Sequence, residues 1–183
     1  EWIDRAGVLW AEGGREGLPL IARISVAVLR AASLDFAGAL ALLDEAEAYS
    51  LTHPDVVSTR ESGRTLNGLR LQWRAQAHPD ELELARTELE ALHASASSAP
   101  PLTRLTLSVT LARLHLFAGQ PERALPLLVD RDGLRTCRPL LQVHRAMAHL
   151  MMRDFAAADT EASEAPEGIS SWPRCQAEMR TLR

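Results

Sequence analysis

The stretch at residues 111–128, LARLHLFAGQPERALPLL, determines the class of fold. Its apolar residues recur every three or four positions, as on one face of an amphipathic helix, until Ala118-Gly119-Gln120-Pro121 interrupts them. A second apolar run opens directly afterwards with Ala124-Leu125. Gly favours helix ends, and Pro favours the first helical position, so the pattern predicts two helices joined by a short turn. A turn this short makes the two helices antiparallel neighbours.

The same punctuation recurs at residues 33–40 and 152–158, which predicts a repeated helical hairpin. An alanine follows each break, and another alanine stands twelve residues earlier on the preceding helix. Small residues on both helices let two backbones pack closely. The three pairs are Ala27 with Ala39, Ala112 with Ala124, and Ala146 with Ala158. One hairpin cannot bury its apolar face alone, so we expect neighbouring hairpins to stack.

Gly, Pro, Asp and Ser clusters divide the remainder of the chain into further helical segments. The expected helices cover about 2–11, 19–33, 36–50, 54–76, 78–93, 102–117, 122–129, 139–152 and 155–165. We expect a single domain over 1–183, with hairpin units at 19–50, 54–93, 102–131 and 138–165 and the start of a further helix at 166–183. The chain starts at Glu1 and ends in a helical-looking segment, so we expect a fragment of a longer protein.

The composition indicates an all-α, water-soluble chain. Ala, Leu, Arg and Glu are abundant, and 46% of the residues are hydrophobic. The net charge of -4, with acids and bases interspersed, argues against direct nucleic-acid contact. No apolar run reaches the ~18 residues of a membrane span. The absence of lysine fits a GC-rich bacterial genome, and Cys137 and Cys175 fit free thiols of a cytoplasmic protein.

The hairpin unit resembles the tetratricopeptide repeat (TPR), a 34-residue helix-turn-helix, and 34 residues separate Ala124 from Ala158. Leu111-Ala112 matches the first helix of the family pattern, Gly119 its turn, Ala124 its packing alanine, and Leu128 the following large residue. The resemblance covers about 19–165. It implies a right-handed superhelix of about four antiparallel hairpins, the first and last elements truncated.

The chain also departs from the family pattern. The late alanine is present as Ala46 and Ala165, but Arg131 occupies that place in the third unit. Arg30, His115 and His149 stand where the family has tyrosine, and the second unit has irregular spacing. Degenerate repeats of this kind are similar to the sensor region of large bacterial LuxR-type regulators of the MalT class. In those proteins an ATPase domain precedes the repeats and a helix-turn-helix follows them.

No group of residues predicts catalysis, a cofactor or a metal. His-Pro-Asp occurs at 53–55 and 78–80, as in J-domain cochaperones, but Pro and Asp are also ordinary helix-start residues. His144 and His149 are five residues apart, which is unlike a zinc-binding pair. His115 is expected to pack within its hairpin with one ring nitrogen satisfied. Glycine-rich phosphate loops and a GxSxG sequence are missing, and the serines of the ASASSAPP segment belong to a loop.

A helical repeat binds partners, and the resemblance places its binding surface on the first helix of each hairpin. The methionines there suit adaptable contacts or core filling, and Arg113 could grip a carboxylate. The side chains expected to face this concave groove are Ile24, Val28, Thr65, Leu69, Gln72, Val109, Arg113, Phe117, Val143, Met147 and Met151.

We therefore expect a non-enzymatic sensor or scaffold region of a multidomain bacterial regulator. It would bind a protein, a peptide or a small effector in the groove, and binding would alter self-association. Two alternatives stay open. One is an oligomerisation module without a small ligand. The other is a helical enzyme that gathers His115, His149, Arg113 and a carboxylate in one pocket.

Overall fold

The computed structural model describes residues 18–53, 59–131, 133–134 and 137–164, and within them every regular element is a helix. The all-α prediction is confirmed. The expected helix at 2–11, residues 54–58 of the second unit, and 165–183 lie outside the described residues. The elements are α2 (Leu18–Ala32), α3 (Phe36–Thr52), α4 (Thr59–Ala77), η1 (Pro79–Glu81), α5 (Leu82–Ser95), α6 (Pro101–Phe117), α7 (Pro121–Ala124), η2 (Leu125–Leu127), α8 (Arg138–Met151) and α9 (Phe155–Glu164).

Three of the hairpins turn in the same way. The α2–α3, α6–α7 and α8–α9 turns each contain one residue in the left-handed region, namely Leu34 (φ 63°), Gly119 (φ 70°) and Arg153 (φ 61°). Only Gly adopts this conformation without strain, so two of the three turns hold a strained residue. The repeated punctuation of the sequence therefore corresponds to a repeated backbone geometry.

Hydrogen bonds define these turns as Schellman caps. In each turn the residue after the left-handed one donates its N–H to the carbonyl five residues back. The bonds are Asp35 to Arg30 (3.0 Å), Gln120 to His115 (2.8 Å) and Asp154 to His149 (2.9 Å). The same residue directly precedes the next helix. Asp35 Oδ1 accepts from the N–H of Gly38, and Asp154 Oδ1 accepts from that of Ala157. One residue thus ends one helix and begins the next.

The alanines that define the hairpins pack as expected. Ala27, Ala39, Ala112 and Ala124 are fully buried, and Ala146 and Ala158 are almost so. Each pair lies on two helices that contact one another. A larger side chain at these places would separate the two backbones.

The second helix of the third hairpin is shorter than expected. The sequence pattern predicts a helix over 122–129, but the structure has the short α7 followed by the 3₁₀ turn η2, which ends at Leu127. Pro126 lies inside this segment. Its ring has no N–H to donate and would clash with the carbonyl four residues back in a regular α-helix, which explains the tighter turn.

The second hairpin, α4–α5, is built differently from the others. Its connection is the 3₁₀ turn η1, which begins at Pro79 after His78, as the helix-start interpretation of this His-Pro-Asp predicts. Twelve residues before the buried Ala85 stands Trp73, only 1% exposed, in place of a small residue. Gly68 of α4 allows close approach to α6 of the next hairpin, because an added Cβ would lie 2.7 Å from Leu107 Cδ2. The second hairpin therefore lacks the alanine pair, and the small residue on α4 packs against the following hairpin.

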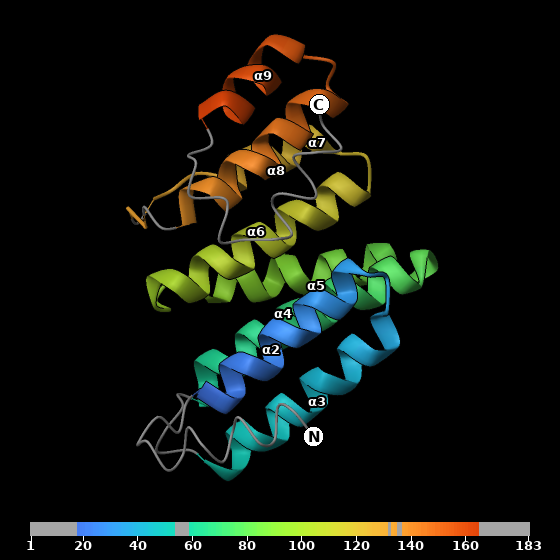
Figure 1. The fold of residues 1–183 in the computed structure, drawn as a ribbon, viewed down its shortest axis with the longest axis vertical. Coiled ribbons are helices and arrows are strands. Elements are labelled where there is room, and N and C mark those ends of the chain that lie inside the picture. Colours follow the sequence, from blue (N-terminus) through green and yellow to red (C-terminus); the bar gives the residue numbers. More distant parts are fainter. Residues whose placement is uncertain (1–17, 54–58, 132, 135–136, 165–183) are drawn as a thin grey trace.

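The hairpins stack along the long axis of the molecule (Figure 1), and neighbouring hairpins share their cores. One cluster joins α2 and α3 to α4, a second joins α4, α5 and α6, and a third joins α6 and α7 to α8. The helix α6 contacts α4, α5, α7 and α8, and its buried residues lie all around its axis. A helix that is apolar on every side belongs in an interior, and α6 is the centre of this stack.

Candidate binding pocket

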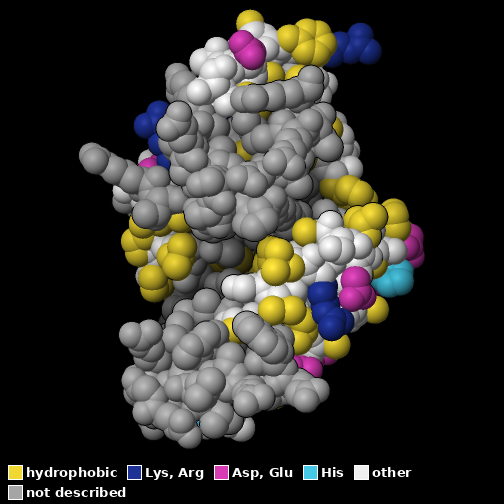
Figure 2. All heavy atoms as spheres, viewed as in Figure 1, with side chains coloured by type: hydrophobic (Ala, Val, Ile, Leu, Met, Phe, Trp, Pro, Cys, Tyr) yellow, Lys and Arg dark blue, Asp and Glu magenta, His cyan; other side chains and the backbone are white. Residues whose placement is uncertain are grey.

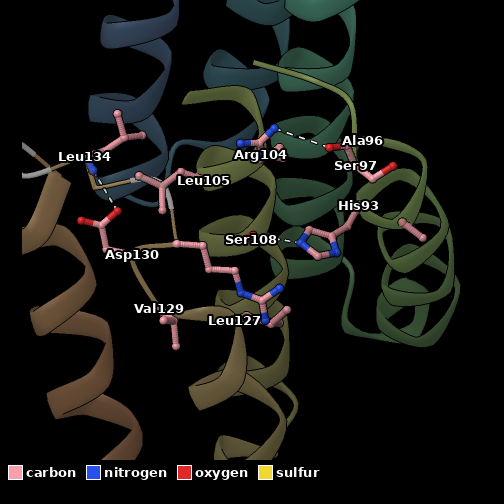
Figure 3. Close-up of a pocket in the computed structure, with 12 residues that line it drawn as sticks. His93, Ala96, Ser97, Arg104, Leu105, Ser108, Leu127, Val129, Asp130 and Leu134 are labelled. Atoms are coloured by element: carbon pink, nitrogen blue, oxygen red, sulfur yellow. Dashed lines mark hydrogen bonds between the residues drawn. The ribbon is translucent and has the colours of Figure 1, made fainter. Parts of the chain in front are cut away.

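A pocket of about 430 Å³ lies where the second hairpin meets the third (Figure 3). Its walls come from the C-terminal end of α5, the α5–α6 loop, the first half of α6, and the end of η2 with the segment that follows it. A volume near the lower end of the range for small-molecule sites suits a small ligand better than a peptide segment. The lining residues are His93, Ala94, Ala96, Ser97, Arg104, Leu105, Ser108, Leu127, Val129, Asp130, Arg131 and Leu134.

The loop between α5 and α6 forms one wall because its small residues fold inwards. Ala96 and Ala99 are buried, and the N–H of Ala99 donates to the carbonyl of Ala96 at 2.9 Å. Arg104 of α6 reaches back to this loop and donates through Nη1 to the carbonyl of Ala99 at 2.7 Å. A positive side chain is thereby fixed against the loop at the edge of the pocket.

The opposite wall is the segment after η2. Asp130 Oδ1 accepts a hydrogen bond from the N–H of Leu134 at 2.8 Å, which closes a short turn. Gly133 in this turn has a φ of 68°, a conformation that glycine adopts freely. Figure 3 shows the Asp130 carboxylate directed to Leu134, away from His93. One carboxylate oxygen is thus engaged by the backbone.

A histidine and a serine meet inside the pocket. His93 Nε2 lies 2.8 Å from Ser108 Oγ, which ties the end of α5 to α6. Burial of the imidazole lowers the pKa of His93, and the positive charge of Arg131 lowers it further. Both effects disfavour the protonated ring, so His93 is neutral at pH 7.

Histidine and serine are two of the three catalytic side chains of a serine hydrolase. The residues around the His93–Ser108 pair do not supply the rest of such a site. Within the described residues no carboxylate is hydrogen-bonded to the second ring nitrogen of His93. Ser108 lies in the middle of α6, where helical hydrogen bonds engage backbone N–H groups that could otherwise stabilise an oxyanion. A histidine with a lowered pKa is also a weaker base. The arrangement therefore suits ligand contacts better than nucleophilic attack.

The residues expected to line the groove lie in two different environments. Four of them are buried between helices: Leu69, Gln72, Val109 and Val143. The expectation that these four side chains are open to a ligand on a concave face is wrong, because they are buried among packed helices. Ile24, Val28, Thr65, Arg113 and Met147 are partly exposed, while Phe117 and Met151 are each 45% exposed. The pocket includes none of these residues.

Two other histidines, His115 and His149, lie beside residues of their own hairpin turns. His115 is 4% exposed, and its Nδ1 lies 3.2 Å from Gln120 Oε1, which confirms the expected packing with one nitrogen satisfied. His149 Nδ1 lies 3.6 Å from Asp154 Oδ2 in the α8–α9 turn. Neither histidine lines the pocket. In the described part of the chain, no three His, Cys, Asp or Glu side chains are grouped as metal ligands.

The face of the molecule drawn in Figure 2 has no single dominant charge among its described residues. In Figure 2 acidic and basic side chains are interspersed with hydrophobic ones over the part of the face that is not grey. None of the described helices is long and apolar enough to cross a membrane.

Sequence reasoning missed the pocket and selected a different arginine. The polar groups of the pocket come from three segments of the chain and follow no common sequence spacing. They are His93, Arg104, Ser108 and Arg131. One signal was present, because Arg131 departs from the small residue that the repeat pattern favours at its position. A large charged side chain at a packing position indicates a local opening, and the pocket is at that place.

The comparisons with known proteins give no relative: no family model, no curated protein and no solved structure matches the chain significantly.

Proposed function

We propose that this chain is a non-catalytic sensor region that binds a small effector in the pocket between its second and third hairpins. The observation that carries the proposal is the position of the pocket. A ligand there would contact α5, α6 and the segment leading to α8, and would thus touch two hairpins and the connection to the next. Occupancy would alter how neighbouring repeats pack, because neighbouring repeats share their cores.

The lining supports a binding role. Leu105, Leu127 and Leu134 supply apolar contact, and the convergent polar groups supply orientation, as in typical small-molecule sites. The resemblance to TPR units of LuxR-type, MalT-like regulators suggests the biological setting, a multidomain bacterial transcription regulator in the cytoplasm. In such a protein the effector would change self-association, and other domains would contact DNA.

A second candidate is an assembly module without a small ligand. The observation that favours it is the apolar end of the last described hairpin, where Met151, Met152 and Phe155 are 45%, 42% and 66% exposed. Such side chains would suit contact with another protein or a second copy of the chain.

Light scattering combined with thermal denaturation separates the two candidates. The chain is measured alone and with a panel of amino acids, sugars, carboxylic acids and nucleotides. The sensor proposal predicts that at least one compound raises Tm and changes the molar mass. Ser108→Phe, which fills the pocket, should abolish both effects, whereas Thr106→Phe on the same helix should keep them. A dimer of constant mass with no response to any compound would favour the assembly module and overturn the sensor proposal.

A further inference from the structure

The charges that line the pocket do not cancel. Among the described lining residues there are two arginines, Arg104 and Arg131, and one aspartate, Asp130, which gives this part of the lining one excess positive charge. Guanidinium groups stay protonated at every pH at which proteins fold, and His93 adds no charge when neutral. One oxygen of Asp130 is also engaged by the N–H of Leu134, so this carboxylate is held by its own turn.

The two arginines have different positions and different tasks. Arg104 is half-buried and holds the α5–α6 loop through the carbonyls of Ala99 and Ser97, so it contributes a fixed positive charge. Arg131 is exposed, and its charge reaches far enough into the pocket to affect His93 on α5. Arg131 can therefore meet an incoming group directly, while Arg104 acts as a positioning residue.

The remaining lining residues give the pocket a polar part and an apolar part. The Ser108 hydroxyl and the His93 ring offer hydrogen bonds near the charged groups, and Leu105, Leu127 and Leu134 offer apolar contact. The size of the pocket favours a small molecule, and the net charge of -4 of the chain disfavours an extended polyanion.

We propose that the pocket selects a small organic anion, a carboxylate or phosphate on a short apolar tail, with Arg131 and Ser108 at the anionic group and the leucines along the tail. This inference rests on the proposed sensor function and names the chemical class of its effector. Carboxylate and phosphate share the chemistry that an arginine recognises, which is a compact set of oxygen acceptors.

Calorimetric titration of the chain with four probes of six carbon atoms each tests the inference. The probes are hexanoate, hexyl phosphate, hexanamide and hexylamine. We expect at least one of the two anions to bind, and the amide and the amine to bind at least about tenfold more weakly, because a charge-assisted hydrogen bond is lost. The tighter of the two anions identifies the preferred group.

Matched variants locate the binding site. Arg131→Gln should weaken the anion about tenfold and leave the amide unchanged, and Arg131→Lys should recover part of the affinity. Arg123→Gln removes the same charge from the exposed surface of α7, away from the pocket, and should change affinity less than about twofold. Circular dichroism checks that each variant is folded.

The outcomes distinguish this inference from the proposal on which it rests. Equal binding of hexanamide and hexanoate, blocked by Ser108→Phe, would overturn the anion inference and leave the sensor function standing. If only compounds without an anionic group bind in the pocket, the anion inference is likewise overturned and the sensor function still stands. An anion that binds equally well to Arg131→Gln also overturns the inference. Failure of these probes and of the whole metabolite panel overturns both.

Discussion

Replacing Leu34 with glycine tests whether the hairpin turns hold backbone strain. Leu34 has a φ of 63°, and its side chain is 77% exposed, so it gains little from burial. The left-handed conformation costs an L-residue roughly 1–2 kcal/mol. Glycine removes this cost but loses roughly 0.5–1 kcal/mol of backbone entropy on folding. The difference predicts that Leu34→Gly stabilises the chain by about 0.5–1 kcal/mol.

Leu34→Ala is the matched control, because alanine also loses the exposed side chain but keeps the backbone strain. In urea unfolding followed by circular dichroism, Leu34→Gly should have a higher free energy of unfolding than Leu34→Ala. Each kcal/mol should correspond to about 2–4 °C in Tm for a chain of this size. At the equivalent turn, Gly119→Ala should lower the free energy of unfolding by about as much as Leu34→Gly raises it. No heavy atom lies within 4 Å of the added Cβ, so only the φ of 70° opposes the substitution. If Leu34→Gly proves no more stable than Leu34→Ala, strain at this turn does not limit stability and the explanation is wrong.

Four further substitutions test the packing of the helices and the pocket. Gly63→Ala should raise the free energy of unfolding by about 1 kcal/mol, because the Cβ meets nothing within 4 Å. Gly68→Ala should lower it, because its Cβ would lie 2.7 Å from Leu107 Cδ2; equal effects in urea unfolding would contradict this packing. The pKa of His93 is lowered in the folded state from 6.5, so the unfolded chain binds more protons just below that pH. Stability should therefore fall as the pH drops below about 6.5, and His93→Gln should reduce the fall in unfolding curves measured at about pH 5.5 and 7.5. Gln72 is fully buried with Oε1 lacking a hydrogen bond, so Gln72→Met should raise Tm, and a lower Tm would reveal an unseen partner for that oxygen.

The hairpins could be predicted because local chemistry determines them. The alanine pairs, the breakers between helices and the short turns all act within about thirty residues of sequence. The sequence pattern did not reveal that Leu34 and Arg153 adopt the same geometry as Gly119, since neither residue favours it. The apolar pattern predicts a helix over 122–129 in spite of Pro126, but the α-helix ends at Ala124 and a 3₁₀ turn follows.

The pocket could not be predicted in the same way. It depends on how the end of α5, the start of α6 and the segment after η2 are placed by packing, and no periodicity connects these elements. The burial of four expected groove residues could not be predicted for a related reason. Helical spacing shows that Gln72 and Val109 share a side with other residues, but it does not show which neighbouring helix covers that side.

The three matching turns have a consequence for how this chain could change length. Asp35 and Asp154 each close one helix and open the next, so those connections contain no spare residue. A single inserted residue would remove the stop signal of one helix together with the start signal of its partner. Length variation should therefore be rejected within these hairpins and tolerated better in the connections between hairpins. Each such hairpin is then a structural unit that we expect to be duplicated or deleted as a whole.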